Sequence, residues 1–86
     1  MRDYSRLSAT QQAEFRVALR RFVEDLRSGS FRKGLRIKHV QSHPGVWEMT
    51  WAPDGRATFR YGDSVHPGDP HIIWRRIGSH DIFSDP

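Results

Sequence analysis

Between residues 8 and 27 the apolar positions recur at intervals of three and four, which is the spacing of one face of an α-helix. Ser8 and Gln11 form a capping-box pattern at the start of this stretch, and Gly29 lies just past its end, where glycine commonly terminates a helix. The pattern therefore predicts one long helix. The side chains that it predicts to face the core are Phe15, Ala18, Leu19, Phe22, Val23 and Leu26.

After residue 34 the apolar spacing shortens to two, the period of a half-buried strand. Four strands are predicted on this basis, over residues 35–38, 46–51, 56–61 and 71–77. Turn sequences with proline and glycine separate the first three strands, and a loop over residues 62–70 precedes the fourth. The fourth strand leaves two alternatives open, because either Ile72 and Trp74 or Ile73 and Ile77 would face the core.

One helix followed by four closely linked strands predicts an α+β fold, in which the N-terminal helix packs across one face of a four-stranded antiparallel sheet. The length of 86 residues corresponds to a single domain, residues 1–86. The other face of the sheet is predicted to be open to solvent and rich in cationic and hydroxyl side chains: Arg36, Lys38, Glu48, Thr50, Arg56, Thr58 and Arg60. Such a surface suits phosphate groups, although an ordinary solvated face would have the same pattern.

The net charge of the chain indicates what kind of partner such a surface would bind. The chain carries 14 Lys and Arg against 10 Asp and Glu, a formal net charge of +4, and 12 of the 14 cations are arginine. Arginine can bind phosphate or carboxylate through two parallel hydrogen bonds, so this composition indicates nucleic acid or an acidic protein as a partner. The alternative is a positive charge that only keeps the protein in solution.

Several classes of site are not expected. The lack of cysteine excludes disulfides and thiolate metal sites, and it is typical of a reducing compartment. The polar first residues are not followed by an apolar run that could act as a signal peptide or span a membrane, so a cytoplasmic location is expected. His39 and His43 have a spacing found in some metal sites, but no cysteine or carboxylate pattern completes the set, and we predict no metal.

Four segments, taken in their order and spacing, resemble the RelE/ParE family of bacterial toxins from type II toxin–antitoxin systems. They are residues 34–38 (GLRIK), 44–47 (PGVW), 56–59 (RATF) and 78–83 (GSHDIF), and the resemblance extends over roughly residues 15–83. It implies a RelE-like fold. It also implies a cognate antitoxin as partner, an acidic and partly disordered protein that would fold over the basic face.

The RelE-like members of the family are ribosome-dependent endoribonucleases, or mRNA interferases, which cut mRNA without a metal and so inhibit translation. The resemblance thus implies an RNA-binding enzyme that needs no cofactor, with mRNA and the ribosome as partners and no membrane. Two alternatives stay open. One is a ParE-like toxin that poisons DNA gyrase, and the other is a non-catalytic module of the same fold that binds nucleic acid or the antitoxin.

Three candidate catalytic residues follow from the resemblance. Arg56 matches the arginine that opens the third strand and would bind the scissile phosphate. His80 lies where the family has an arginine or histidine, and an imidazole there would act as general acid or base near neutral pH. Glu48, predicted on the same face as Arg56, would act as a base or orient His80. His80 and Asp81 are not expected to touch, because neighbours on a strand point to opposite faces.

Five further residues are candidates for RNA binding: Arg36, Lys38, Arg60, Arg76 and Phe83. Arg36 and Lys38 match positions where the family has basic residues that hold RNA. Arg75 and Arg76 are expected to face opposite ways, so only one of them would reach the basic face. Phe83 stands where many members carry a tyrosine; it can stack on a base but cannot donate a proton.

Overall fold

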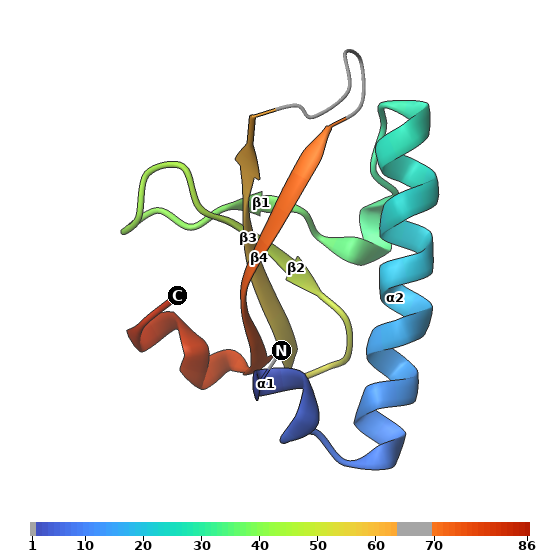
Figure 1. Ribbon diagram of the computed structural model, residues 1–86, viewed down its shortest axis with the longest axis vertical. Helices are drawn as coiled ribbons and strands as arrows, with labels where there is room; N and C mark the ends of the chain where they lie inside the picture. Colours follow the sequence, from blue (N-terminus) through green and yellow to red (C-terminus); the bar gives the residue numbers. More distant parts are fainter. Residues whose placement is uncertain (1, 64–69) are drawn as a thin grey trace.

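The computed structural model describes residues 2–63 and 70–86 (Figure 1). Along the chain it contains α1 (Arg2–Ser5), α2 (Ala9–Ser28), the 3-10 turn η1 (Lys33–Leu35), β1 (Lys38–His39), β2 (Trp47–Thr50), β3 (Gly55–Gly62), β4 (His71–Ser79) and the 3-10 turn η2 (His80–Ser84). The strands form one antiparallel sheet in the order β1-β2-β3-β4. The predicted α+β class, with one long helix and a four-stranded antiparallel sheet, is confirmed.

Helix α2 begins and ends where the sequence indicates. The Ser8 Oγ atom accepts a hydrogen bond from Gln11 N at 3.1 Å, and Gln11 Oε1 accepts one from Ser8 N at 2.8 Å. At the other end Gly29 has a φ of 82°, and its N–H donates to the carbonyl of Asp25 at 3.0 Å. This left-handed conformation costs glycine little, which is why the helix stops there.

Figure 1 shows α2 lying along one face of the sheet, and this inner face holds the core. Phe22 is 1% exposed, and its ring lies 5.1 Å from the rings of Phe59 and Trp74. Val23, predicted to face the core, is instead 39% exposed. At about 100° per residue Val23 falls beyond the edge of the buried stripe, and the opposite edge is occupied by Asp25.

The first predicted strand is largely wrong. Residues 33–35 form η1, Arg36 adopts a left-handed φ of 48°, and pairing with β2 begins only at Lys38. Leu35 is nevertheless buried at 3% exposure. The alternating pattern over four residues therefore identified the buried side chain correctly. It could not show that residues 35–37 have no neighbouring strand to pair with.

The ambiguity in β4 is resolved by a β-bulge. Thr58 pairs with Arg76 but Phe59 pairs with Trp74, so one β4 residue, Arg75, has no partner on β3. The bulge shifts the phase of the alternation. As a result Ile72 and Trp74 pack against the core on one side of it and Ile77 is buried on the other.

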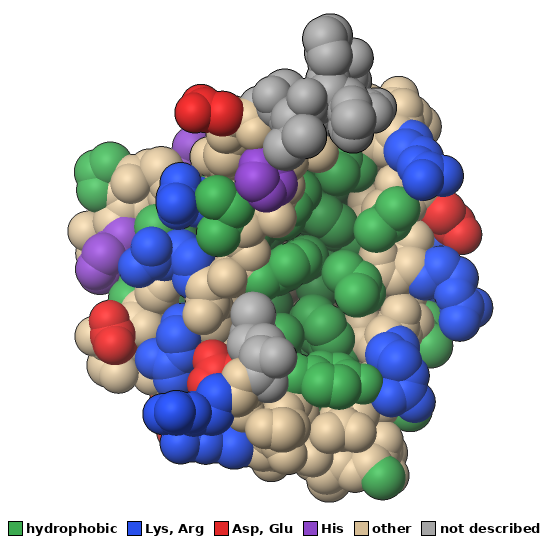
Figure 2. Space-filling model, in the orientation of Figure 1, with side chains coloured by type: hydrophobic (Ala, Val, Ile, Leu, Met, Phe, Trp, Pro, Cys, Tyr) green, Lys and Arg blue, Asp and Glu red, His purple; other side chains and the backbone are tan. Residues whose placement is uncertain are grey.

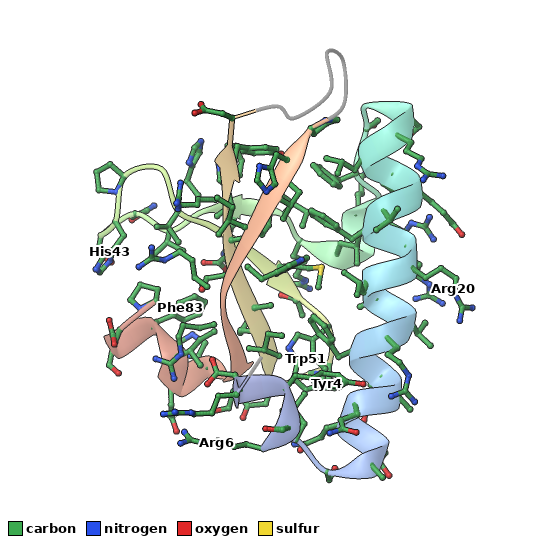
Figure 3. All side chains as sticks on the ribbon, in the orientation of Figure 1. Tyr4, Arg6, Arg20, His43, Trp51 and Phe83 are labelled. Carbon is green, nitrogen blue, oxygen red and sulfur yellow. The ribbon has the colours of Figure 1, made fainter. Side chains whose placement is uncertain are left out.

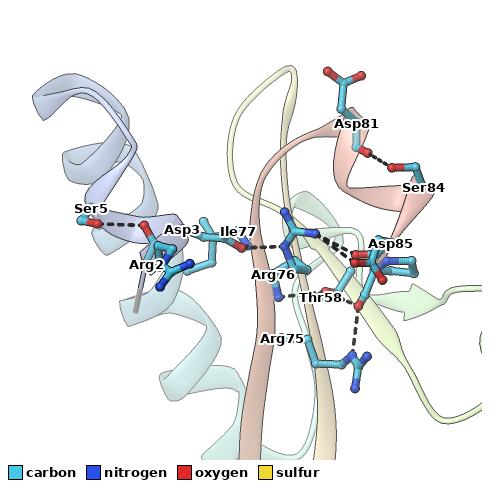
Figure 4. A network of polar contacts seen from close by, with 11 residues as sticks. Arg2, Asp3, Ser5, Thr58, Arg75, Arg76, Ile77, Asp81, Ser84 and Asp85 are labelled. Carbon is cyan, nitrogen blue, oxygen red and sulfur yellow. Dashed lines mark hydrogen bonds and ion pairs between the residues drawn. The ribbon is translucent and has the colours of Figure 1, made fainter.

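The same bulge corrects the expectation that the neighbouring arginines face opposite ways. The Arg75 Nε atom donates to the carbonyl of Pro86 at 2.9 Å, and Arg76 Nη1 donates to the carbonyl of Asp85 at 3.0 Å (Figure 4). Both guanidinium groups therefore reach the C-terminal segment, because the extra residue removes the side-to-side alternation at this point.

The C-terminal segment, residues 80–86, lies across the sheet on the face opposite α2 (Figure 1). Ile82 is 6% exposed, and Thr58 beneath the segment is fully buried. Thr58 Oγ1 donates to the carbonyl of Pro86 at 3.4 Å and accepts from Arg76 N at 3.1 Å. The outer face of the sheet is thus covered over Thr58, which corrects the prediction that it is open to solvent along its whole width.

Residues 2–5, for which the sequence predicted no element, form α1 beside the edge of β4. The Asp3 carboxylate accepts hydrogen bonds from Arg76 Nε at 2.8 Å and from Ile77 N at 3.0 Å (Figure 4). Burial by itself would raise the pKa of Asp3, but these hydrogen bonds and the charge of Arg76 outweigh it, and the pKa lies below its usual value. Asp3 thereby satisfies an N–H of an edge strand.

The predicted loop over residues 62–70, with His66, falls mostly outside the described residues. No helix in the described part of the chain has both the length and the hydrophobicity that crossing a membrane requires.

Candidate nucleic-acid interface

A hollow of about 440 Å³, which we call the arginine pocket, lies between α2, η1 and the turn that joins β2 to β3. Four arginines from different segments line it: Arg21, Arg32, Arg36 and Arg56. Two of them, Arg36 and Arg56, are sequence-predicted site residues, and the other two are not. The pocket therefore unites part of the predicted site with side chains that the alternation of single strands could not reveal.

Arg56 leaves the base of β3 and folds over the preceding turn. Its Nη1 atom donates to the carbonyls of Gly55 at 2.9 Å and of Ala52 and Pro53 at 3.3 Å each. Within residues 2–63 and 70–86 no carboxylate lies within 4.0 Å of this guanidinium group. The carbonyls orient the side chain without neutralising its charge.

Arg32 is held in the opposite manner. Its Nε and Nη2 atoms donate to the two carboxylate oxygens of Asp25 at 2.8 Å each, and Arg32 N donates to the same carboxylate at 2.8 Å. The hydrogen bonds from the Arg32 side chain and backbone lower the pKa of Asp25 from 3.8 to about 2. Arg32 therefore lines the pocket with a charge that Asp25 already balances.

Asp25 is also the residue that sequence reasoning missed most clearly. It falls on the buried side of α2, three positions after Phe22, and is only 9% exposed. A carboxylate at such a position requires a cationic partner. That was the available signal, although the sequence could not say which arginine meets it across the end of the helix.

Trp51 forms another wall of the arginine pocket. Its ring packs so closely on Gly55 that a Cβ atom added there would lie 2.5 Å from the indole Cδ2. Figure 3 shows Trp51 between α2 and the sheet. Among the described residues its Nε1 is the one buried side-chain nitrogen or oxygen that has no hydrogen-bond partner. Such a donor typically costs about 1–3 kcal/mol of stability.

On the outer face, Lys38 and Glu48 lie side by side, a contact that the sequence did not predict. They are direct cross-strand partners, and Lys38 Nζ lies 3.7 Å from Glu48 Oε1. The Glu48 side chain is only 12% exposed, whereas that of Lys38 is 68% exposed. Arg60 is exposed on the same face, beyond Thr58. Figure 2 shows Lys and Arg side chains gathered on the side of the molecule away from α2.

The C-terminal candidates lie at η2. His80 is exposed at its first residue, and its ring contacts that of Phe83 edge-on, with centroids 4.8 Å apart. Figure 3 shows Phe83 on the side of the sheet away from α2. His80 and Asp81 lie in a 3-10 turn rather than on a strand, and the described contacts contain no pair between them.

The structure does not bring the three candidate catalytic side chains into one cluster. Arg56 binds the carbonyls of the β2–β3 turn, His80 contacts Phe83, and Glu48 is engaged with Lys38, so no contact joins any two of the three in the described part of the chain. Arg76 is engaged as well, because its Nε lies 2.8 Å from Asp3 Oδ2 and its Nη1 lies 3.8 Å from Asp85 Oδ2. Its charge is therefore already balanced.

No group of three or more His, Asp or Glu side chains in the described ranges is arranged to hold a metal ion. Comparison of the chain with protein-family models, with curated proteins and with solved structures found no match. The functional conclusion therefore depends on the sequence pattern and on the geometry of the arginines.

Proposed function

We propose that the protein is the toxin of a type II toxin–antitoxin system of the RelE/ParE kind, and that it acts as a metal-independent, ribosome-dependent endoribonuclease on mRNA. The observation that carries this proposal is the convergence of Arg36 and Arg56 on one pocket. The family resemblance assigns both to RNA. Neither has a carboxylate within ion-pairing distance in the described part of the chain, so both charges are available to a phosphate.

The strand register supports a joint role for Arg56 and His80 at one end of the sheet, with their side chains apart. Arg56 pairs with Gly78, and His80 follows Gly78 by two residues, so both belong to the same end of the sheet. In the proposed reaction the ribose 2′-oxygen forms a bond to the adjacent phosphorus and the P–O5′ bond breaks. Arg56 stabilises the charge on the phosphate, a base removes the 2′-OH proton, and an acid protonates the leaving oxygen.

His80 and Glu48 are the candidates for these proton transfers. His80 is exposed, and RNA that crosses the end of β3 would have to bridge the separation between its imidazole and Arg56. Glu48 faces the outer side but is paired with Lys38. We therefore assign proton transfer first to His80 and give Glu48 and Lys38 the secondary role of shaping the charge of the outer face.

An acidic antitoxin is the partner that this proposal requires. A groove of about 350 Å³ between α2 and β4 is lined mainly by apolar side chains, including Phe15, Leu19 and Trp74, and Arg16 lies at its margin. Figure 2 shows this apolar surface flanked by cationic side chains of α2. An amphipathic acidic segment would match both the apolar floor and the basic margin.

The proposal is tested by inducible expression in a bacterial host, with mapping of mRNA ends. Expression should arrest growth. New mRNA ends should appear while ribosomes translate the mRNA and should not appear when translation is blocked. Arg56→Ala and His80→Ala should each reduce cleavage by about 100-fold or more, the scale expected when a phosphate-binding group or a general acid–base is lost. Arg20→Ala is the matched control, because Arg20 points away from the sheet (Figure 3).

Three results would contradict the proposal in different ways. If both variants cut as well as the wild type, the site assignment is wrong. If growth stops while mRNA stays intact and DNA damage signalling rises, the protein is a gyrase-poisoning toxin. If neither growth nor mRNA changes, the chain is a binding module of the same fold.

A further inference from the structure

We propose that the arginine pocket is a binding site for one phosphate group of a nucleic-acid strand, with Arg21, Arg36 and Arg56 as the cationic donors and Trp51 as a fixed wall. The choice of a nucleic acid rests on the proposed function, whereas the phosphate chemistry follows from the pocket alone. Arg21 and Trp51 have no role in the family resemblance, so the site goes beyond the residues assigned so far.

The charges that face the pocket are unbalanced. Arg32 is neutralised by Asp25, but no carboxylate lies within 4.0 Å of Arg21, Arg36 or Arg56 in residues 2–63 and 70–86. Like charges that converge on one hollow repel one another, and a bound anion relieves that repulsion. The pocket is therefore suited to a dianionic or monoanionic ligand.

Trp51 forms a fixed wall of the pocket. The side chain is 8% exposed and lines the hollow, while its Nε1–H is buried and has no acceptor in the described part of the chain. The indole therefore shapes the pocket, and its resonance reports on a ligand that enters beside it. Trp51 also lines a smaller hollow on its other side, but that one contains Glu14 and Asp54, which would repel an anion.

The Arg56 side chain is oriented before any ligand arrives, and the backbone that carries Arg36 is held in place. Arg36 has a left-handed backbone conformation, and its backbone N–H donates to the carbonyl of Lys33 at 3.0 Å. The Arg56 Nη1 atom donates to three backbone carbonyls, so Nε and Nη2 are available to a second partner. Such preorganisation reduces the entropic cost of binding.

A neighbouring hollow favours a nucleic-acid strand over an acidic peptide as the source of the anion. This second hollow, of about 610 Å³, shares Arg32 and Arg36 with the arginine pocket and is lined by the rings of Trp47 and Tyr61. Tyr61 is 42% exposed. An aromatic surface beside a cationic pocket suits a base next to its phosphate, because every base can stack on an aromatic ring.

The test is a titration of ¹⁵N-labelled protein, followed through the three tryptophan indole N–H resonances. Inorganic phosphate and a short oligouridylate are added in separate arms, and a glutamate-rich peptide is added in a third. Phosphate and the oligonucleotide should both shift the Trp51 resonance, with tighter binding of the oligonucleotide, and should leave that of Trp74 in place. Neither ribosomes nor cleavage are needed.

Arg21→Ala should weaken phosphate binding by about tenfold, the loss expected for one charge-assisted hydrogen bond. It should also lower the salt dependence of oligonucleotide binding by about 0.7 in the log–log slope. Arg20→Ala should bind like the wild type.

The phosphate site is overturned if neither phosphate nor oligouridylate moves the Trp51 resonance, or if Arg21→Ala binds both as tightly as the wild type. Its assignment to nucleic acid is overturned if the acidic peptide alone shifts Trp51, or if oligouridylate binds no tighter than inorganic phosphate. A protein that binds oligouridylate here but leaves mRNA intact in cells would keep this inference and lose the proposed endoribonuclease activity.

Discussion

Arg32 and Arg56 line the same pocket, but only the charge of Arg32 is balanced by a carboxylate. Arg32 meets both oxygens of Asp25 and ties the end of α2 to the segment before η1. Arg56 donates only to backbone carbonyls, so no carboxylate balances its charge. Arg76, between Asp3 and Asp85, belongs with Arg32, whereas Arg21 and Arg36 belong with Arg56.

This difference separates arginines that hold the fold together from arginines that are free to bind. An ion pair with excellent geometry at a partly buried position stabilises the folded chain, and its removal leaves an unpaired charge. An arginine without a carboxylate adds little to stability and contributes repulsion to its neighbours. The two groups therefore respond differently to acid, to loss of a carboxylate and to added phosphate.

Acid should have the largest effect on stability. The pKa of Asp25 is about 2 in the folded protein against an ordinary value of 3.8, and that of Asp3 is also lowered. Because both folded values are depressed, their contribution is complete above about pH 4 and is lost as the pH falls toward 2. Thermal unfolding followed by circular dichroism should show a steep fall of Tm across this interval; a flat profile would contradict it.

Asp25→Asn should lower Tm more than any other single carboxylate substitution, because it leaves Arg32 without its two-oxygen partner. It should also flatten the Tm profile between about pH 4 and pH 2. Glu24→Gln is the matched control, since Glu24 contacts the same arginine at 3.2 Å but its side chain is 60% exposed. Equal effects of the two substitutions would show that the Arg32–Asp25 pair stabilises the fold no more than the exposed Arg32–Glu24 pair.

Asp3→Asn should be milder, with a loss of about 1 kcal/mol in the free energy of unfolding, because it removes a charged hydrogen-bond acceptor from Arg76 and Ile77. Asp81→Asn, on exposed η2, should change stability by less than about 0.5 kcal/mol. Chemical denaturation at neutral pH measures both. A loss at Asp81 as large as that at Asp3 would show that α1 does not hold the edge of β4.

Arg21→Ala and Arg36→Ala should have the smallest effect on stability, within about 0.5 kcal/mol in the absence of ligand. Phosphate at ten times its Kd should then stabilise the wild type by about 1.4 kcal/mol and the variants by less. Thermal unfolding with and without phosphate measures the difference. A large loss of stability in either variant without phosphate would mean that these arginines serve the fold after all.

The elements of the fold were predictable from the sequence where they depend on neighbouring residues. The capping box at Ser8, the stop at Gly29 and the alternation in β2 and β3 all lie within a few residues of the structure they specify. The first strand was wrong because its pattern is short and its pairing with β2 begins only at Lys38. The bulge at Arg75 could not be read, because it exists only as a mismatch between two strands.

The candidate site was predictable in the same partial way. Alternation assigned Lys38 and Glu48 to the same face but did not show that they pair, and the arginine content indicated an anionic partner. It could not show that Arg21 of α2 and Arg56 of β3 line one pocket, nor that the C-terminal segment covers Thr58, since both facts join residues far apart in the chain.

By itself the sequence determined the length and ends of α2, the order of helix and strands, and the excess of arginine, because these depend on neighbouring residues and on composition. Only the tertiary structure decided which arginines are paired with a carboxylate and which are not. Pairing with Asp25, Asp3 or Asp85 depends on distances across the folded chain, and a guanidinium group is neutralised only by the carboxylate that packing brings within reach.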